Sequence, residues 1–462
     1  MSKIKSALSA GMAAAAMLTS VAFAQESGAV ETAVAVEAVV ETVAQTASTA
    51  PAPDTAFIFN TLSFLIMGMV VMFMAAGFCM LEAGLVRSKN AATICLKNIT
   101  IYSIATVMVW LIGYNIIYGV EEGGYIGTLS MWAADDSAAL DTGYSASSDW
   151  FFQMVFVATA ASIVSGTMAE RVRLWPFFIF TAVLTGLIYP IQASWEWGGG
   201  WLDARYGFSD FAGSTLVHAT GGWAALAGAI ALGPRRGKYG PNGQINVIRG
   251  SSLPLATLGT FILWLGWFGF NGGSQLALWS IDDSIAISNI FVNTNMAAAA
   301  GVITVVVLST FLKRKIDLSM ALNGAIGGLV SITAEPLMPA VWQAALIGCV
   351  GGGVIFVVTP LLEYARIDDV VGAIPAHLFC GIWGTIAVPL SNSDATFVGQ
   401  AVGIVANGLF VFTISLVLWF LLRMIVGIRA SADEEEKGLD DSEIGAPAWP
   451  DFSDAPALKP AE

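Results

Sequence analysis

One nine-residue pattern occurs twice in this chain, as DFAGSTLVH at residues 210–218 and as DVVGAIPAH at residues 369–377. Each copy has Asp first, Gly three residues later and His eight residues later, and the copies are displaced by 159 residues (369 against 210). His218 and His377 are the only two histidines in the 462 residues. A Gly and a Trp follow each copy, at Gly221 and Trp223 and at Gly381 and Trp383. The repeat therefore marks both histidines as equivalent positions of a duplicated unit.

The sequence around the two copies is apolar. Hydrophobic residues make up 56% of the chain and charged residues 12%, with a mean hydropathy of +0.73. Soluble domains carry about 25% charged residues, so an ordinary soluble enzyme and a disordered chain are both excluded. Eleven apolar stretches are long enough to cross about 30 Å of hydrocarbon. They are 56–81, 98–118, 150–169, 174–195, 211–233, 252–279, 287–312, 318–334, 340–362, 371–390 and 399–426. We predict an all-α polytopic membrane protein with eleven transmembrane helices.

The two copies begin the fifth and the tenth of these helices, which run in opposite directions because five crossings separate them. This is the signature of an inverted-topology repeat of five helices each, with a site near the membrane midplane. At 1.5 Å per residue, each histidine lies about 12 Å inside its own face of the membrane. In a hydrocarbon core of about 30 Å, the two imidazoles then arrive near one depth, close enough to touch.

The basic residues predict the orientation. Of the sixteen Lys and Arg between residues 55 and 429, all except Arg205 fall at one set of helix ends. Thirteen of the nineteen acids in this stretch fall at the opposite ends. The positive-inside rule places the basic ends in the cytoplasm, the mature N-terminus outside and the C-terminus in the cytoplasm.

The chain divides into four predicted segments. Residues 1–24 resemble a cleaved signal peptide, because Lys3 and Lys5 precede an apolar run that ends in a small-x-small pattern. Residues 25–55 form an acidic periplasmic arm, residues 56–429 the eleven-helix domain, and residues 430–462 a cytoplasmic tail with ten acids and two bases. The net charge of -14 therefore lies mainly in the two appendages.

Intramembrane ionisable groups have two interpretations. A lone buried histidine in a soluble protein is more often structural than functional, but inside a bilayer the cost of burial favours a functional role. Asp210 and Asp369 are either N-caps of the helices that follow them or, in the case of Asp210 near the outer mouth, also a group that attracts cations. The sequence leaves both roles open.

Cofactor, metal and enzyme chemistry find no support in the sequence. The four cysteines lie in apolar runs without CxxC spacing, so we predict no disulfide and no cysteine-based metal site. Two histidines at one depth are also a haem-ligand arrangement. Close packing around a shared hydrogen bond would leave no room for a porphyrin, and His377-x-x-Cys380 is not a c-type attachment motif. No phosphate loop or nucleophile triad is visible, so we predict no enzyme, no cofactor and no nucleic-acid partner.

Eight motifs together resemble the ammonium transporter (Amt/Mep/Rh) family, on its bacterial Amt side, over nearly all of residues 56–430. They are LEAGLVRSKN (81–90), AERVR (169–173), WEWGGGWL (195–202), DFAGSTLVHATGG (210–222), LGWFGFNGGS (265–274), FVNT (291–294), IDDVVGAIPAH (367–377) and CGIWGT (380–385). The resemblance implies eleven helices with an outer N-terminus, a homotrimer with one pore per subunit, and a location in the cell (inner) membrane. It implies transport of ammonium or ammonia, with methylammonium as an analogue.

The resemblance also implies site residues. Trp197, Phe156 and Ser274 match the outer recruitment site, where a cation rests on an indole face. Phe156 and Phe270 match two stacked phenyl rings that gate the pore below it.

Three further positions match the pore itself. Asp210 matches the buried acid near the outer vestibule, and His218 and His377 match the twin histidines. The expected mechanism is recruitment of ammonium, deprotonation near Asp210, and passage of neutral ammonia along the histidines. A bare cation costs tens of kcal/mol to move into an apolar medium, so potassium and sodium would be excluded.

Three positions depart from the family pattern. Val370 stands where Pro is frequent, Leu378 where Gly is frequent beside the pore, and Ile444 where a His is usual in the tail. The resemblance implies a regulatory tail that contacts neighbouring subunits, a P-II type signalling partner, and Ser442 at the position of a phosphorylatable Thr in some relatives.

Two other functions fit the same scaffold. An ammonium sensor would bind the ion in order to signal, and flux into proteoliposomes distinguishes it from a transporter. An Rh-like gas channel is disfavoured because Trp197 and Ser274, the Amt-type cation site, are both present.

Overall fold

The computed structural model describes residues 53–450. The predicted signal peptide (1–24), nearly all of the predicted arm (25–55) and the last residues of the tail lie outside the described residues. Residues 56–450 belong to one compact unit, Ala56–Glu462.

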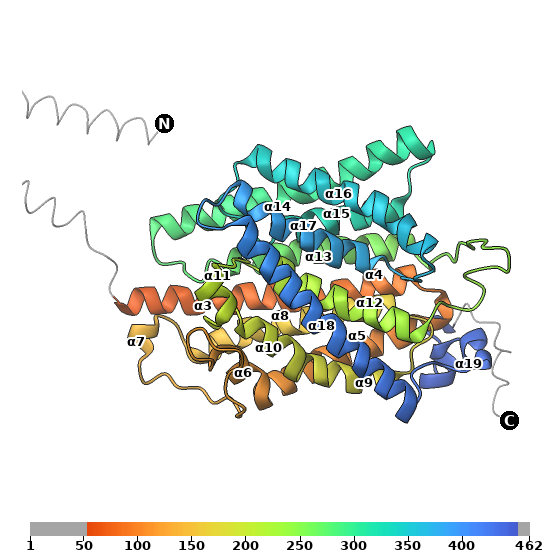
Figure 1. The fold of residues 1–462 in the computed structure, drawn as a ribbon, viewed down its shortest axis with the longest axis horizontal. Coiled ribbons are helices and arrows are strands. Elements are labelled where there is room, and N and C mark those ends of the chain that lie inside the picture. Colours follow the sequence, from red (N-terminus) through yellow and green to blue (C-terminus); the bar gives the residue numbers. More distant parts are fainter. Residues whose placement is uncertain (1–52, 451–462) are drawn as a thin grey trace, which may run out of the picture. The chain divides into compact units, whose positions relative to one another are not determined.

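This unit is a bundle of helices (Figure 1), and the described residues contain isolated β-bridges but no β-strand. Among the described residues, nine helical segments are long and apolar enough to cross a membrane, and the two shorter apolar helices Leu318–Ile332 and Ile374–Leu390 complete a set of eleven. Each segment falls on one of the eleven predicted stretches. The prediction of an all-α polytopic membrane protein is confirmed, and the chain is a multi-pass membrane protein.

Three of the first four crossings use interrupted helices, and the third crossing is one continuous helix, α8 (Ala146–Thr167). The four crossings comprise α3 (Pro53–Met72) with α4 (Met74–Leu85), α5 (Ala91–Met108) with α6 (Tyr114–Tyr118), α8, and α9 (Leu174–Val183) with α10 (Tyr189–Ser194). The short helices α7 (Ala139–Thr142) and α11 (Trp201–Tyr206) lie in the connecting loops.

The remaining crossings are α12 to α18. They comprise α12 (Thr220–Leu232), α13 (Leu253–Gly273), α14 (Ile281–Leu308), α15 (Leu318–Ile332), α16 (Val341–Tyr364), α17 (Cys380–Ala387) and α18 (Phe397–Ile425). A π-helical turn, wider than an α-helical turn, precedes α12 at Ser214–Ala219 and α17 at Ile374–Phe379.

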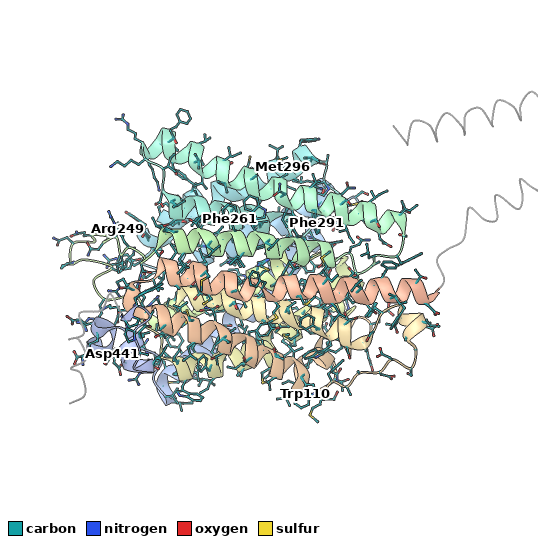
Figure 2. The ribbon with its side chains drawn as sticks, turned by 180° about the vertical axis from the view of Figure 1, so that it is seen from behind. Trp110, Arg249, Phe261, Phe291, Met296 and Asp441 are labelled. Atoms are coloured by element: carbon teal, nitrogen blue, oxygen red, sulfur yellow. The ribbon has the colours of Figure 1, made fainter. Side chains whose placement is uncertain are left out.

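Large apolar side chains cover the outside of the bundle. Phe261 on α13 and Met296 on α14 lie in the upper half of the view in Figure 2 and Trp110 near its lower border, and Phe261 is 64% exposed. Such a surface is unfavourable in water and favourable in lipid, which agrees with eleven membrane crossings.

Small residues let the helices pack closely within the bundle. At Gly348 of α16, an added Cβ would lie 2.1 Å from the carbonyl oxygen of Ala297 on α14. No side chain fits in that space, so the two backbones are in direct contact, as is typical of helices packed in lipid.

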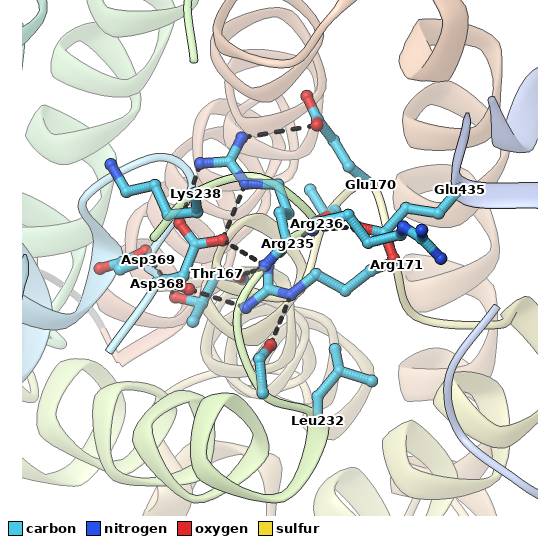
Figure 3. Close-up of polar contacts among 12 residues, drawn as sticks. Thr167, Glu170, Arg171, Leu232, Arg235, Arg236, Lys238, Asp368, Asp369 and Glu435 are labelled. Carbon is cyan, nitrogen blue, oxygen red and sulfur yellow. Dashed lines mark hydrogen bonds and ion pairs between the residues drawn. The ribbon is translucent and has the colours of Figure 1, made fainter. Parts of the chain in front are cut away.

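The basic ends of the helices are joined by buried ion pairs. Arg235, in the loop after α12, donates to both carboxylate oxygens of Asp368 at 2.9 Å, and its Nη1 lies 3.5 Å from Glu170 (Figure 3). Arg171 donates to the backbone carbonyl of Asp368 at 2.7 Å. Because Asp368 precedes the tenth crossing and Arg235 follows the fifth, this network connects the two halves of the inverted repeat.

The first part of the acidic tail packs against the same basic ends. Helix α19 (Ala432–Lys437) and a π-helical turn at Asp440–Ile444 follow α18. Asp440 accepts hydrogen bonds from the backbone N–H groups of Ala92 and Thr93 and from the Thr93 hydroxyl, at 2.7–3.0 Å. Specific contacts with the start of α5 therefore hold this part of the tail against the bundle, and it is not a freely solvated segment.

Candidate functional site

Each histidine lies just past a turn that the repeat pattern builds in the same way. In the first copy, the Asp210 carboxylate accepts from the backbone N–H groups of Gly213, Ser214, Thr215 and Leu216, at 2.7–3.1 Å. Gly213 has a φ of 106°, a conformation that residues with a Cβ rarely adopt. The Asp-x-x-Gly spacing thus supplies both the cap and the turn that start this helix.

The second copy repeats this arrangement from the other face. The Asp369 carboxylate accepts from the N–H groups of Gly372 and Ile374 and from the Thr167 hydroxyl, at 2.7–3.2 Å. Gly372 has a φ of 79°. Helix N-capping, one of the roles that the sequence leaves open, therefore accounts for the carboxylate contacts of both Asp210 and Asp369.

The two π-helical turns bring the histidines together. Nδ1 of His377 lies 3.2 Å from Nδ1 of His218, and their ring centroids are 5.2 Å apart with planes 28° from parallel. Both side chains are buried. The two imidazoles, for which the repeat predicts an equal depth, are in direct contact.

A contact between two Nδ1 atoms fixes the tautomers of a neutral pair. One ring donates from Nδ1–H and leaves its Nε2 as an acceptor, while the other accepts at Nδ1 and carries its proton on Nε2. Nε2 of His218 is buried and has no hydrogen-bond partner. The pair therefore presents one acceptor and one donor to a small polar molecule beside it.

Aromatic rings support the pair on both sides. The Trp267 ring stacks on His218 with centroids 4.9 Å apart, and its indole N–H donates to the Thr333 hydroxyl at 2.8 Å. The Phe78 ring centroid lies 6.2 Å from that of His377. These contacts hold both imidazole planes.

A column of rings leads from the pair towards the acidic ends of the helices. Phe270 lies 5.2 Å from His218 between centroids, Phe156 lies 4.1 Å from Phe270, and Trp197 lies 6.1 Å from Phe156. The two phenyl rings are 30° from parallel and buried. No path for a hydrated ion is open between rings at this distance.

A cavity of 110 Å³ lies beyond the phenyl rings, and we call it the Trp197 cavity. Its lining residues include the three predicted recruitment residues, Trp197, Phe156 and Ser274. The Ser274 hydroxyl donates to the Phe270 carbonyl at 2.9 Å, so its oxygen lone pairs are left to accept a hydrogen bond. Tyr118 and Gln153 also line this cavity, and no motif in the sequence pointed to them.

Asp210 lies beside the Trp197 cavity but does not line it. It is completely buried, and among the described residues it is not one of those that line the Trp197 cavity. Four N–H groups occupy its carboxylate oxygens, while its backbone carbonyl accepts from the Trp197 indole N–H at 3.0 Å. Its contacts hold the Trp197 ring and the start of the π-helical turn.

Two cavities lie on the other side of the histidines. The smaller, the His377 cavity, measures 10 Å³ and is lined by His377, Phe78 and Glu82 among others. The larger, the Arg235 cavity, measures 440 Å³ and lies at the basic ends. Asn323 and Val371 line both cavities, so they form the boundary between them.

The departures at Val370 and Leu378 lie at different depths. Leu378 is buried in a hydrophobic cluster and packs on α12, where an added Cβ at Gly222 would lie 2.6 Å from it. Val370 lines the Arg235 cavity. Leu378 therefore packs behind the pore, against a glycine that makes room for it.

Some residues that support the site cannot be recognised from any sequence motif. Gln192 donates to the Leu216 carbonyl at 2.8 Å and accepts from Asn407 at 2.6 Å, which satisfies a carbonyl of the first π-helical turn. A lone amide in an apolar stretch has many structural explanations.

The sequence predicts Lys97 at a cytoplasmic helix end, but the structure places it inside the second crossing, where it is 1% exposed. The helix of this crossing begins earlier than expected.

Within residues 53–450, no group of three or more His, Cys, Asp and Glu side chains is placed to hold a metal ion.

Comparisons with known proteins match the whole bundle. The model of the Ammonium Transporter Family matches residues 62–449. Ammonium transporter Amt2 of Archaeoglobus fulgidus is 40% identical over 417 residues, which are 84% of this chain and 87% of that protein. The ammonium transporter of Bacillus subtilis is 33% identical over 419 residues, 86% of this chain and 98% of that protein.

Solved structures show the same similarity. The protein described as "Sensor Amt Protein" has a TM-score of 0.79 at 35% identity, covering 84% of this chain and 98% of its own. Mep2 of Candida albicans has a TM-score of 0.75 at 25% identity, covering 83% and 89%.

Proposed function

The chain belongs to the ammonium transporter family, and from this premise we propose that it conducts ammonium, in the form of ammonia and a proton, across the cell membrane. The observation that carries the proposal is the contact between His218 and His377 at the end of the ring column. The protein acts as a transporter and not as an enzyme, and its chemistry requires no cofactor.

The first step is recruitment in the Trp197 cavity. Ammonium rests against the Trp197 and Phe156 rings, where an indole face attracts a cation, and donates to the Ser274 oxygen. The cavity has room for several water-sized molecules, so the ion keeps part of its hydration there.

The second step is loss of a proton before the phenyl gate. A cation between Phe156 and Phe270 would lose its hydration at a cost of tens of kcal/mol, whereas neutral ammonia would not. Because four N–H groups occupy the Asp210 carboxylate, Asp210 holds the site in shape and water in the cavity takes the proton. Potassium and sodium have no proton to lose and are excluded.

The third step is passage along the histidines. Ammonia donates to the Nε2 acceptor of one ring and accepts from the Nε2–H of the other, so the pair replaces the hydrogen bonds that ammonia had in water. It leaves through the His377 and Arg235 cavities.

The orientation and assembly belong to the same proposal. The basic ends face the cytoplasm by the positive-inside rule, which places the Trp197 cavity outside. Residues 1–24 are a signal peptide, 25–55 a periplasmic arm, 56–429 the transport domain and 430–462 a cytoplasmic tail that a P-II type protein contacts. The subunits form a homotrimer in the inner membrane.

A flux experiment tests the proposal. Proteoliposomes with the purified protein should take up methylammonium, and an ammonium pulse on a solid-supported membrane shows whether charge moves with it. Replacing both histidines (H218A with H377A) should reduce uptake or its selectivity over potassium. Unchanged uptake and selectivity in this double variant would show that the pore lies elsewhere.

A sensor is the second candidate, because one of the similar solved structures is a sensor Amt protein. The same experiment distinguishes the two functions. Ammonium binding without flux in the wild-type protein would favour the sensor, and flux would favour the transporter.

A further inference from the structure

The His377 cavity contains a carboxylate that the pathway described above does not use. Glu82 of α4 lines this cavity together with His377 and is 1% exposed. The cavity, at 10 Å³, has room for about one water-sized molecule. Ammonia and ammonium are of this size.

One oxygen of this carboxylate has no hydrogen-bond partner. Oε2 of Glu82 accepts from the Ser165 hydroxyl at 2.6 Å, whereas Oε1 is buried and unpartnered. The neighbouring Asn98 donates its amide to the Ile94 carbonyl at 3.1 Å. A buried carboxylate oxygen without a donor is costly, so this site favours a molecule that brings N–H groups.

A lysine lies near the Glu82 carboxylate, but it does not donate a hydrogen bond to Oε1. Nζ of Lys97 on α5 donates to the Ser165 carbonyl at 2.8 Å and lies 5.0 Å from the centroid of the Phe177 ring. Ser165 therefore lies between the two charged groups, with its hydroxyl on Glu82 and its carbonyl on Lys97. This arrangement places a positive charge near Glu82 and leaves Oε1 without a hydrogen-bond donor.

The cavity adjoins the basic ends of the helices. Asn323 and Val371 separate it from the Arg235 cavity, and the Asn323 amide N–H donates to the Val371 carbonyl at 3.0 Å. The two cavities therefore adjoin at Asn323 and Val371, and we expect a small molecule to exchange between them there.

We infer that Glu82 is a binding site for ammonium on the cytoplasmic side of the histidine pair, with Oε1 accepting an N–H of the ion. The inference rests on the proposed function, because the ammonia that passes the histidines reaches this cavity and becomes ammonium there by taking up a proton delivered by water from the adjoining Arg235 cavity. Ammonium suits the site by its size and its donors, whereas potassium and sodium bring no hydrogen bond to Oε1. The charge of Lys97 weakens the site enough for the ion to leave.

Infrared difference spectroscopy on the full-length protein in proteoliposomes tests this inference directly. Spectra are recorded in ammonium chloride and in choline chloride. The wild-type protein should show an ammonium-induced shift of a carboxylate band. E82Q combined with K97M, which removes both buried charges together, should lack this shift. E196Q is the matched control, because Glu196 also has a buried unpartnered oxygen but lines none of the Trp197, His377 and Arg235 cavities. E196Q should keep the shift.

Flux measurements supply the second readout. The ammonium current of the E82Q/K97M protein should fall by about tenfold or more, as expected when a hydrogen bond to a charged group is lost. If the double variant does not fold, E82D keeps the charge but moves the oxygens by one methylene, and it should raise the ammonium concentration that half-saturates the band shift.

Each outcome decides the question. A band shift that persists in E82Q/K97M, or wild-type flux in that variant, would show that Glu82 serves only as the counterion of Lys97. The same conclusion follows if E82D leaves the half-saturating concentration unchanged. A wild-type protein without flux but with the Glu82-dependent shift would contradict the transport proposal and leave the binding site standing.

Discussion

Asp210 shows at the scale of one residue how a structural role and a functional role combine. Its carboxylate gathers four backbone N–H groups, and its carbonyl holds the indole of Trp197. An acid in this position therefore holds the Trp197 ring in place, and in the proposed mechanism it acts on the recruited cation through that ring. The sequence alone left capping and cation attraction as alternatives, because spacing cannot show which donors reach a carboxylate.

Replacing Asp210 by Asn should destabilise the protein. The Asn side chain offers one acceptor oxygen, and its amide hydrogens would meet backbone N–H groups that are themselves donors. We expect D210N to lower the free energy of unfolding by about 2–3 kcal/mol, the scale of a lost hydrogen bond to a charged group. Thermal unfolding in detergent measures this change. D203N, at an exposed position on α11, is the control, and equal stability of the two variants would contradict the role assigned to Asp210.

At the scale of the element, glycines set how closely neighbouring helices pack. Gly348 and Gly353 both lie on α16, but they differ in what surrounds them. An added Cβ at Gly348 would lie 2.1 Å from the Ala297 carbonyl, whereas one at Gly353 would have no atom within 4 Å.

Substituting Ala at these two positions should therefore have opposite effects. G348A has to push α14 and α16 apart and should lower the melting temperature in detergent. G353A meets no neighbour and should be neutral or raise stability by up to about 1 kcal/mol, since Ala is the better helix former. Similar losses in both variants would mean that backbone contact at Gly348 does not hold the pair of helices.

The docked tail permits a second test at this scale. Asp440 binds the start of α5, whereas its neighbour Asp441 is exposed (Figure 2). D440A should release residues 430–449 and increase their cleavage in limited proteolysis, while D441A should not. A cleavage pattern that is unchanged in D440A would show that the buried Leu439 and the Glu435 contacts suffice.

At the scale of the whole molecule, the buried ion pairs of Figure 3 connect the two halves of the repeat. Burial alone would raise the pKa of Asp368, but the hydrogen bonds from Arg235 and the charge of Arg171 outweigh it, and they hold the pKa well below its ordinary value. The carboxylate therefore contributes stability that is complete above the unfolded pKa of about 4 and is lost as pH falls below it.

A comparison of the wild type with D368N should show this pH dependence. The difference in melting temperature should stay constant between about pH 5 and 8 and shrink below about pH 4, where the unfolded carboxyl takes up a proton. Melting curves across this range measure it. A difference that already shrinks between pH 7 and 5 would require an Asp368 pKa that is raised, contrary to its contacts.

The sequence predicted the large features because each depends on a count or a period. Apolar length predicted eleven crossings, and the displaced repeat predicted that His218 and His377 share one depth. Features that depend on where a helix turns or begins were missed. Lys97 was expected at a helix end because the apolar stretch was counted from residue 98, although Asn90, a residue type common at N-caps, precedes α5. With Lys97 at a helix end, Glu82 had no visible counterion, so the pair could not be identified.

The π-helical turns at Ser214–Ala219 and Ile374–Phe379 determine which mutations the pore can tolerate during evolution. A wide turn of this kind is equivalent to an α-helix with one residue inserted. Deleting one residue from either turn would rotate the imidazole on that helix by about 100° and separate it from its counterpart. Point substitutions leave this register intact, whereas a single-codon deletion destroys it. Descendants of this gene can therefore vary widely in side chains around the pore, but they must conserve the number of residues between each aspartate and its histidine.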